Sequence, residues 1–250
     1  MHYLIKDTEI TKILNYLFQI KGIHKRNVVR LRNFIEAIFY MSRAGCSWRL
    51  LPESYGSWRS LHKRFKQWSE RNIWKQLFEQ SKIDPDFEYV MIDSTIVRAH
   101  ACAAGYGKNS QEKEALGRSK GGFTTKIHAV VDALGNPLEF SLTSGQRHDI
   151  TQADFLTKDL KGDFLLADKG YDSNAFIKNI TQKGFISVIP SRKNRKQPRN
   201  YDDFLYQDRS RIECFFSKIK HFRRIFSRFD KCANSFLSFV YFVGMLIWLR

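Results

Sequence analysis

The sequence is poor in acidic residues and in residues that break secondary structure. Its 250 residues contain 25 Asp plus Glu against 42 Lys plus Arg, which gives a formal net charge of +17. With 43% apolar residues, 14 Gly and 5 Pro, the chain is neither disordered nor collagen-like and can bury a core of ordinary size. The excess of positive charge predicts a polyanionic partner, which means nucleic acid or an anionic membrane surface.

Cysteine is also scarce, and its spacing suits neither a zinc site nor a disulfide framework. The four cysteines lie tens of residues apart without a C-x-x-C pair. We therefore expect free thiols and a cytoplasmic protein. Asp7 and Glu9 stand where a secretory signal needs an uninterrupted apolar stretch, which argues against export.

Only one segment is apolar enough to raise the question of a membrane. Residues 232–249 (CANSFLSFVYFVGMLIWL) carry no charge and have basic residues on both sides. The run is at the short end of the roughly 20 apolar residues that a bilayer needs, and it includes Asn234, Ser235 and Ser238. A buried terminal helix is the better interpretation, so we expect no membrane partner.

Residues 1–83 are predicted to form a helical domain that binds DNA. Apolar residues recur at helical spacing over 28–41 and again over 61–78, with basic residues interleaved. Residues 1–82 hold 16 Lys plus Arg against 6 Asp plus Glu, more than half the net charge in a third of the chain. A solvated face would normally mix both signs, so this imbalance and four interleaved tryptophans favour DNA binding. The candidate DNA contacts are Arg30, Arg59, Lys63 and Arg64.

Beyond the linker IDPDFE the pattern changes to strands. Two runs, 88–100 and 124–146, are strand-like, and the second contains a hairpin turn at 134–137. Two more strands, DFLLADKGYD and FISVIPS, each follow a predicted helix, and these helices lie at 150–160 and 173–183. Strands that come first and then alternate with helices indicate a mixed α/β sheet.

Two polar stretches interrupt this pattern and are predicted to be loops. The first, 100–123, is rich in Gly, and the chain has no G-x-x-x-x-G-K-[ST] phosphate-binding loop. The second, 191–203, places five basic residues in nine.

Two aspartates interrupt or end the predicted strands, and three more compete with them. Asp93 lies inside an apolar run, and Asp168 ends one. Because burial of an isolated carboxylate is costly, each should be paired, hydrogen-bonded or bound to a metal. For Asp168 alone, an N-cap or a turn is the more ordinary interpretation. Asp132, Asp149 and Asp172 remain alternatives for the same role.

An amphipathic helix is predicted over 206–229. At 100° per residue, Tyr206, Arg209, Glu213 and Lys220 fall within a wedge of roughly 60°, flanked by Arg224, beside an apolar stripe. A lone Glu among basic residues indicates an acidic centre in a phosphate-binding surface. Three carboxylates beside a basic groove suit phosphoryl transfer by two magnesium ions about 4 Å apart.

The sequence resembles the DDE transposases of bacterial insertion sequences, and most closely the insertion-sequence-five group. The likeness covers nearly the whole chain, through RAGCSWRLLPESYGSWRSLHKRFKQW, MIDSTIVRAH, GRSKGGFTTKIHAVVDALGNPLEF, SGQRHD and LLADKGYDS. It includes a signature of Tyr, two residues, Arg, three residues, Glu, six residues and Lys. Tyr206, Arg209, Glu213 and Lys220 meet this signature.

The resemblance implies a ribonuclease-H-like catalytic domain over 84–250, a mixed sheet flanked by helices. In it, Asp93, Asp168 and Glu213 hold two Mg²⁺ ions, for which Mn²⁺ can substitute. By the family pattern Asp168, rather than Asp172, is the second ligand.

The resemblance also assigns DNA contacts. Tyr206, Arg209 and Lys220 would hold DNA near the cleavage site, with Arg224 as a further candidate, and residues 1–83 would recognise the terminal inverted repeats.

The function expected from this resemblance is cleavage of DNA at the ends of an insertion sequence, followed by joining of the freed 3′ ends to target DNA. The expected assembly is a homodimer or higher oligomer on double-stranded DNA, associated with the bacterial nucleoid. Two alternatives stay open: a nuclease of the same fold that joins no strands, and an inactive DNA-binding relative. Strand-transfer product excludes the first, and metal-dependent cleavage excludes the second.

Overall fold

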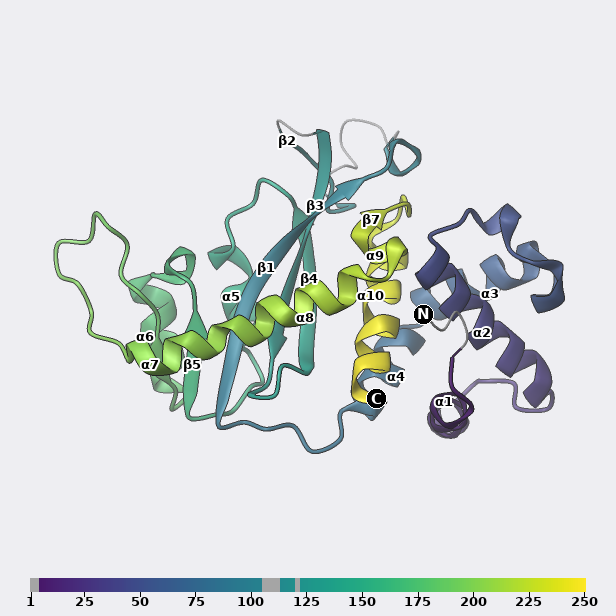
Figure 1. Ribbon diagram of the computed structural model, residues 1–250, viewed down its shortest axis with the longest axis horizontal. Helices are drawn as coiled ribbons and strands as arrows, with labels where there is room; N and C mark the ends of the chain where they lie inside the picture. The colour runs from purple at the N-terminus through teal and green to yellow at the C-terminus, as the bar shows by residue number, and fades with distance from the viewer. Residues whose placement is uncertain (1–4, 105–112, 120–121) are drawn as a thin grey trace. The chain divides into compact units, whose positions relative to one another are not determined.

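The computed structural model describes residues 5–104, 113–119 and 122–250 (Figure 1). The chain divides into two compact units. The helical unit comprises the described parts of Met1–Ile83, Arg98–Ser110 and Ile219–Arg250, and the sheet unit comprises those of Asp84–Val97 and Gln111–Lys218.

The helical unit is a group of amphipathic helices around an aromatic core. Its helices are α1 (Asp7–Gln19), α2 (Val28–Ala44), α3 (Trp58–Glu70), α4 (Ile73–Ser81), α9 (Arg223–Phe226) and α10 (Ala233–Trp248), with 3-10 turns at Trp48–Leu50, Glu53–Tyr55 and Ala101–Ala103. α10 packs on α3 and α4, and α9 packs on α2. Phe34, Phe65, Trp68 and Trp74 are buried against one another, so two of the four tryptophans that interleave with the basic residues are core residues.

The predicted helices of this unit are present, with one division that the periodicity did not show. Asn72 adopts a left-handed backbone with φ 54°, which Asn tolerates better than most residues, and it separates α3 from α4. The apolar run 232–249 forms α10, most of which is buried, so the predicted packed helix is confirmed. Among the described helices, none has the length and apolar character needed to cross a bilayer.

The predicted boundary at residue 83 coincides with a boundary between the units, but 84–250 is not one unit. The end of the chain, 219–250, groups with the N-terminal helices because α10 covers the apolar faces of α3 and α4. Compact units and functional domains need not coincide, so the division of function between 1–83 and 84–250 stays a prediction.

The sheet unit is organised around a mixed sheet. The strands are β1 (Tyr89–Ala99), β2 (Gly117–Ser119), β3 (Gly122–Val131), β4 (Pro137–Ser144), β5 (Phe164–Ala167), β6 (Ile186–Val188) and β7 (Ser227–Arg228). Their order is β2-β3-β1-β5-β6, with β4 paired to β3. β1, β5 and β6 are parallel, whereas β3 and β4 form the predicted antiparallel hairpin. The short β7 pairs with the last residues of β1 inside the helical unit.

Helices flank this sheet on both faces. They are α5 (Ile150–Leu156), α6 (Asn174–Gln182), α7 (Asp203–Tyr206) and α8 (Ser210–Lys220), with 3-10 turns at Lys169–Tyr171 and Gln207–Arg209. Phe140 of β4 stacks on Phe215 of α8, with 5.9 Å between ring centroids. The next residue, Ser141, donates from Oγ to Gln152 of α5 at 3.0 Å. Because successive strand residues point to opposite faces, α8 and α5 cover opposite faces, and α8 crosses in front of the strands in Figure 1.

The strand order and the flanking helices confirm the predicted ribonuclease-H-like α/β fold. Two details differ from the prediction. The strand β2 lies in the predicted loop 100–123, of which 105–112 and 120–121 fall outside the described residues. The single helix predicted over 206–229 is broken, because α8 ends at Lys220 and α9 begins at Arg223. Between them Phe222 is extended and buries its ring against Phe39 and Arg43, so packing overrides the helical period.

Candidate functional site

Asp93 and Asp168 lie on neighbouring strands at adjacent positions. The parallel pairing of β1 with β5 ends at Ile92 and Ala167, and the two aspartates follow directly. Asp93 accepts a hydrogen bond from the backbone N–H of Ser94 at 2.7 Å. Asp168 accepts one from Gly170 at 2.8 Å and caps the turn that follows. The ordinary interpretation of Asp168 as a cap is therefore correct, and it does not exclude a role beside Asp93.

Arg209 joins Asp93 to Glu213. Its Nη1 donates to Asp93 Oδ2 at 2.6 Å, and its Nη2 donates to Glu213 Oε1. Arg209 ends a 3-10 turn and Glu213 lies one turn later in α8, so the spacing of four residues brings both to one side. Tyr206 stacks beside them, with 5.9 Å between its ring centroid and the guanidinium carbon. The structure thus brings four of the predicted site residues together next to Asp168.

Electrostatics at this site favour binding of a cation. Burial raises the pKa of Asp93 to about 6, and the nearby negative charge of Asp168 adds to the rise. The Ser94 N–H and the Arg209 charge act in the opposite direction without cancelling it. Only 18% of the Asp93 side chain is exposed, so little solvent screens these charges. A buried carboxylate next to a second one gains most from a cation between them.

The donor set fits a divalent cation in chemistry, although Arg209 holds part of it. Carboxylate oxygens are the ligands that Mg²⁺ and Mn²⁺ prefer. Yet in the described parts of the chain no three His, Cys, Asp or Glu side chains stand close enough to hold an ion as they are. Arg209 occupies one oxygen of Asp93 and one of Glu213, so a cation requires this arginine to move.

Two of the competing aspartates have structural partners that account for them. Asp132 is fully buried and accepts the Asn136 backbone N–H at 2.7 Å, which closes the turn between β3 and β4. Asp172 is buried and pairs with Arg195 and Arg199. Burial by itself would raise the pKa of Asp172, but these partners lower it. Two basic residues of the stretch 191–203 therefore neutralise Asp172.

Arg224 was predicted to contact DNA, and the structure does not support this. Its side chain is 3% exposed, and it forms an ion pair with Asp230, from Nη2 to Oδ1 at 2.8 Å and from Nε to Oδ2 at 3.1 Å. Its Nη1 donates to the Cys46 carbonyl at 2.9 Å, and the guanidinium lies over the Phe239 ring. Helical periodicity placed Arg224 beside the wedge. Because the helix breaks after α8, the Arg224 side chain points instead into the core of the helical unit.

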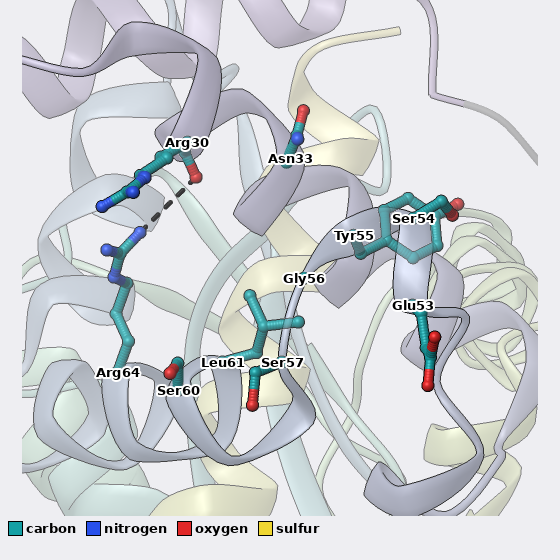
Figure 2. Close-up of a pocket in the computed structure, with 10 residues that line it drawn as sticks. All are labelled: Arg30, Asn33, Glu53, Ser54, Tyr55, Gly56, Ser57, Ser60, Leu61 and Arg64. Carbon is teal, nitrogen blue, oxygen red and sulfur yellow. Dashed lines mark hydrogen bonds between the residues drawn. The ribbon is translucent and has the colours of Figure 1, made fainter.

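Basic side chains of the helical unit form a candidate DNA surface. Arg30 of α2 and Arg64 of α3 lie next to each other at a cavity of about 450 Å³ that Ser57 and Ser60 also line (Figure 2). Arg64 Nη1 is 3.5 Å from the carbonyl oxygen of Arg30. Burial and the Arg30 charge lower the pKa of Arg64. Neither arginine has an ion pair among the residues that the structure describes, although the carboxylate of Glu53 also lines this cavity.

The remaining predicted contacts are dispersed. Arg59 and Lys63 are exposed on α3, and the Arg59 guanidinium lies over the Trp58 ring at 5.0 Å. Lys220 is the last residue of α8 and belongs to the helical unit, where burial lowers its pKa.

The spacing argument did not single out Asp149. It lies in the motif SGQRHD, accepts hydrogen bonds from Ser94 and Lys126, and borders a cleft with Asp168. The sequence of β3 contained a signal, since Lys126 is the single charged residue of that strand.

Comparisons with known proteins agree on one family. Residues 5–78 match a family described as a putative transposase of the IS4/5 family, and residues 85–237 match a family described as a transposase DDE domain. A putative transposase for insertion sequence element IS6501 from Brucella ovis is 42% identical over 132 residues, 51% of this chain and 99% of that protein. An uncharacterized protein, y4sN, from Sinorhizobium fredii is 42% identical over 74 residues, 30% of this chain and 59% of that protein.

One solved structure is also similar. The piggyBac transposase in a synaptic complex with hairpin DNA matches 78% of this chain and 50% of its own, at 15% identity and a TM-score of 0.42. The chain thus corresponds to about half the length of that protein.

Proposed function

The chain belongs to the DDE transposase family of the IS4/5 type, and from this membership we propose that it cuts DNA at the ends of an insertion sequence and joins the freed 3′ ends to target DNA. DDE transposase domains act on DNA with divalent metal ions. The observation that carries the proposal is the gathering of Asp93, Arg209 and Glu213 by direct hydrogen bonds beside Asp168.

The three carboxylates Asp93, Asp168 and Glu213 are the proposed ligands of two Mg²⁺ ions, for which Mn²⁺ can substitute. A divalent cation there supplies positive charge that stabilises the attacking and leaving oxygens of an in-line displacement at phosphorus. Asp93 directly follows the paired residues of β1 and Asp168 directly follows β5, so the neighbouring backbone pairing limits their movement. The side chain of Glu213 is 57% exposed, so it is free to change its conformation when substrate binds.

Arg209 has two roles in this proposal. Without a cation it bonds to Asp93 and Glu213 and offsets part of their negative charge, which keeps the carboxylates together. Once released from these carboxylates, the guanidinium would be free to hold a DNA phosphate near the cut. Tyr206 stacks beside Arg209, and we assign it and Lys220 to contacts with the same DNA.

DNA recognition is assigned to the helical surface of residues 1–83. Arg30 and Arg64 border the cavity in Figure 2 without an ion pair among the described residues, and Arg59 and Lys63 extend the basic surface along α3. These side chains suit phosphate contacts, and α3 itself has the length to enter a major groove. The terminal inverted repeats as the recognised sequence, target DNA as the second substrate and a homodimer or higher oligomer as the active form are parts of this proposal that rest on the family.

The test is an assay with paired duplexes that carry the ends of the element. The full-length protein with Mg²⁺ or Mn²⁺ should release 3′ hydroxyl ends and join them to a labelled target duplex. Cleavage without joined product would favour the nuclease alternative. Binding of the ends without any cleavage, in both metals, would favour an inactive DNA-binding relative.

A further inference from the structure

A polar cluster lies on the sheet face opposite Asp93. Ser94, the next residue in β1, donates from Oγ to Asp149 Oδ1 at 2.7 Å. Lys126 of β3 donates from Nζ to the same oxygen at 2.8 Å and to the Arg147 carbonyl at 2.7 Å. Asp149 is the residue immediately before α5, the helix that covers this face. Successive strand residues point to opposite faces of the sheet, so Asp93 faces one side and Ser94 faces the other. The two residues are joined by one peptide bond, which connects the groups on the two faces.

The cluster is unusually polar for the interior of a sheet. The Lys126 and Asp149 side chains are 10% and 27% exposed. Asp149 immediately precedes α5, yet its side chain does not cap that helix. His128 is fully buried, donates to or accepts from Thr143 Oγ1 at 2.8 Å, and has Nδ1 at 3.8 Å from Asp149. Burial lowers the pKa of His128 to about 4, so it adds no positive charge at neutral pH.

Tyr171 connects this cluster to the carboxylate site. Its side chain is completely buried, and within the described structure its hydroxyl has no hydrogen-bond partner. Burial and then the charges of Asp149, Asp93 and Asp168 raise the pKa of Tyr171, because the hydroxyl lies near all three carboxylates. Asp149 and Asp168 also border one cleft. The cluster is therefore next to the proposed metal ligands, although it provides none of them.

Stability alone does not explain a partly buried Lys–Asp pair. Apolar residues of similar volume often stabilise a fold as well as such a pair does, because the pair must lose its hydration. The pair instead fixes the orientation of Ser94. It holds the Ser94 hydroxyl on one face of the sheet, while the Ser94 N–H donates to Asp93 Oδ1 on the other face. Groups that orient ligands in this way commonly change metal affinity about 10-fold to 100-fold.

We propose that Lys126, Asp149 and Ser94 form a positioning relay that fixes the orientation of Asp93 from the opposite face of the sheet. This inference rests on the proposed function, in which Asp93 is a metal ligand. Ser94 is the link, Asp149 is its acceptor, and Lys126 holds the acceptor in place. None of the three touches the metal or the DNA.

The test compares Ser94→Ala with Ser94→Thr in the full-length protein. Ser94→Ala removes the hydroxyl that reaches Asp149, whereas Ser94→Thr keeps it and suits a strand. The first measurement is the affinity of the protein for Mn²⁺ in the absence of DNA, and electron paramagnetic resonance monitors the binding. The second is the single-turnover rate of end cleavage. Ser94→Ala should weaken Mn²⁺ binding about 10-fold and slow cleavage by a similar factor. Ser94→Thr should restore both.

Asp149→Asn provides the second variant. The side-chain oxygen of Asn can still accept the hydrogen bond from the Ser94 hydroxyl, but the negative charge that holds Lys126 is lost. Asp149→Asn should therefore also weaken Mn²⁺ binding. Adding Ser94→Ala to this variant should weaken Mn²⁺ binding little further. Wild-type affinity and rate in Ser94→Ala would overturn the relay, and so would equal losses in Ser94→Ala and Ser94→Thr. Failure of the proposed function gives a different result. In that case the wild-type protein would not cleave DNA, and Asp93→Asn would bind Mn²⁺ as well as the wild type does.

Discussion

Substitution of Asp93 by Asn should change how the stability of the protein depends on pH. Asp93 is held in the folded state with a pKa of about 6, against 3.8 for an ordinary aspartate. The folded protein therefore binds this proton more tightly than the unfolded chain does. The stabilising contribution is fully present below about pH 4 and is lost as the pH rises through 6. Asn carries no charge at any of these pH values and avoids this loss.

The size of the effect follows from the pKa difference. At about 1.4 kcal/mol for each tenfold change in an equilibrium, the shift corresponds to about 3 kcal/mol. Without metal, the free energy of unfolding of Asp93→Asn relative to the wild type should therefore rise by about 2 kcal/mol between pH 4.5 and pH 8, because the rest of the difference develops below pH 4.5. Saturating Mg²⁺ should reduce this difference at pH 8, because a cation that binds the folded wild type stabilises it.

Urea denaturation of the full-length protein with a chelator, at several pH values from 4.5 to 8, measures this difference. Asp159→Asn is the matched control, because Asp159 is an exposed carboxylate of the same unit. Its free energy of unfolding should follow that of the wild type across the range. A difference between Asp93→Asn and the wild type that stays constant with pH would refute the reasoning.

Three further outcomes follow from the contacts described above. Arg224→Met should lower the free energy of unfolding by about 3 to 5 kcal/mol, measured by denaturation, because Asp230 is left buried without its partner. It should leave DNA affinity of the folded protein unchanged. Asp172→Asn should lower the melting temperature at neutral pH and have less effect at pH 3, since the depressed pKa means that its contribution is lost on acidification. Replacement of both Arg30 and Arg64 by Gln should reduce the slope of log affinity against log salt by about 2, and a slope equal to that of the wild type would remove them from the DNA surface.

The hairpin and the two ligand strands could be predicted from the sequence because their signals are local. Two apolar runs on either side of the turn at 134–137 are sufficient to predict β3 and β4. Asp93 and Asp168 stood out because each interrupts or ends an apolar run, and the register of β1 with β5 places them at adjacent positions.

Signals that depend on distant partners could not be predicted in this way. Nothing in the chain near Asp149 distinguishes it from Asp132, because the partners of Asp149 come from β1 and β3. The break after Lys220 depends on a pocket for Phe222 that α2 supplies. Since the helix ends there, the face calculated for residue 224 no longer applies, and the arginine enters the core.

Cleavage by the carboxylate variants tests the central claim most directly. Asp93→Asn, Asp168→Asn and Glu213→Gln would each be mixed with a labelled duplex that carries an end of the element, in Mg²⁺ or Mn²⁺. Each substitution should remove nearly all cleavage and strand transfer, and binding of the duplex should survive or become slightly tighter because negative charge is lost beside phosphate. Full cleavage by all three variants would contradict the assignment of this site.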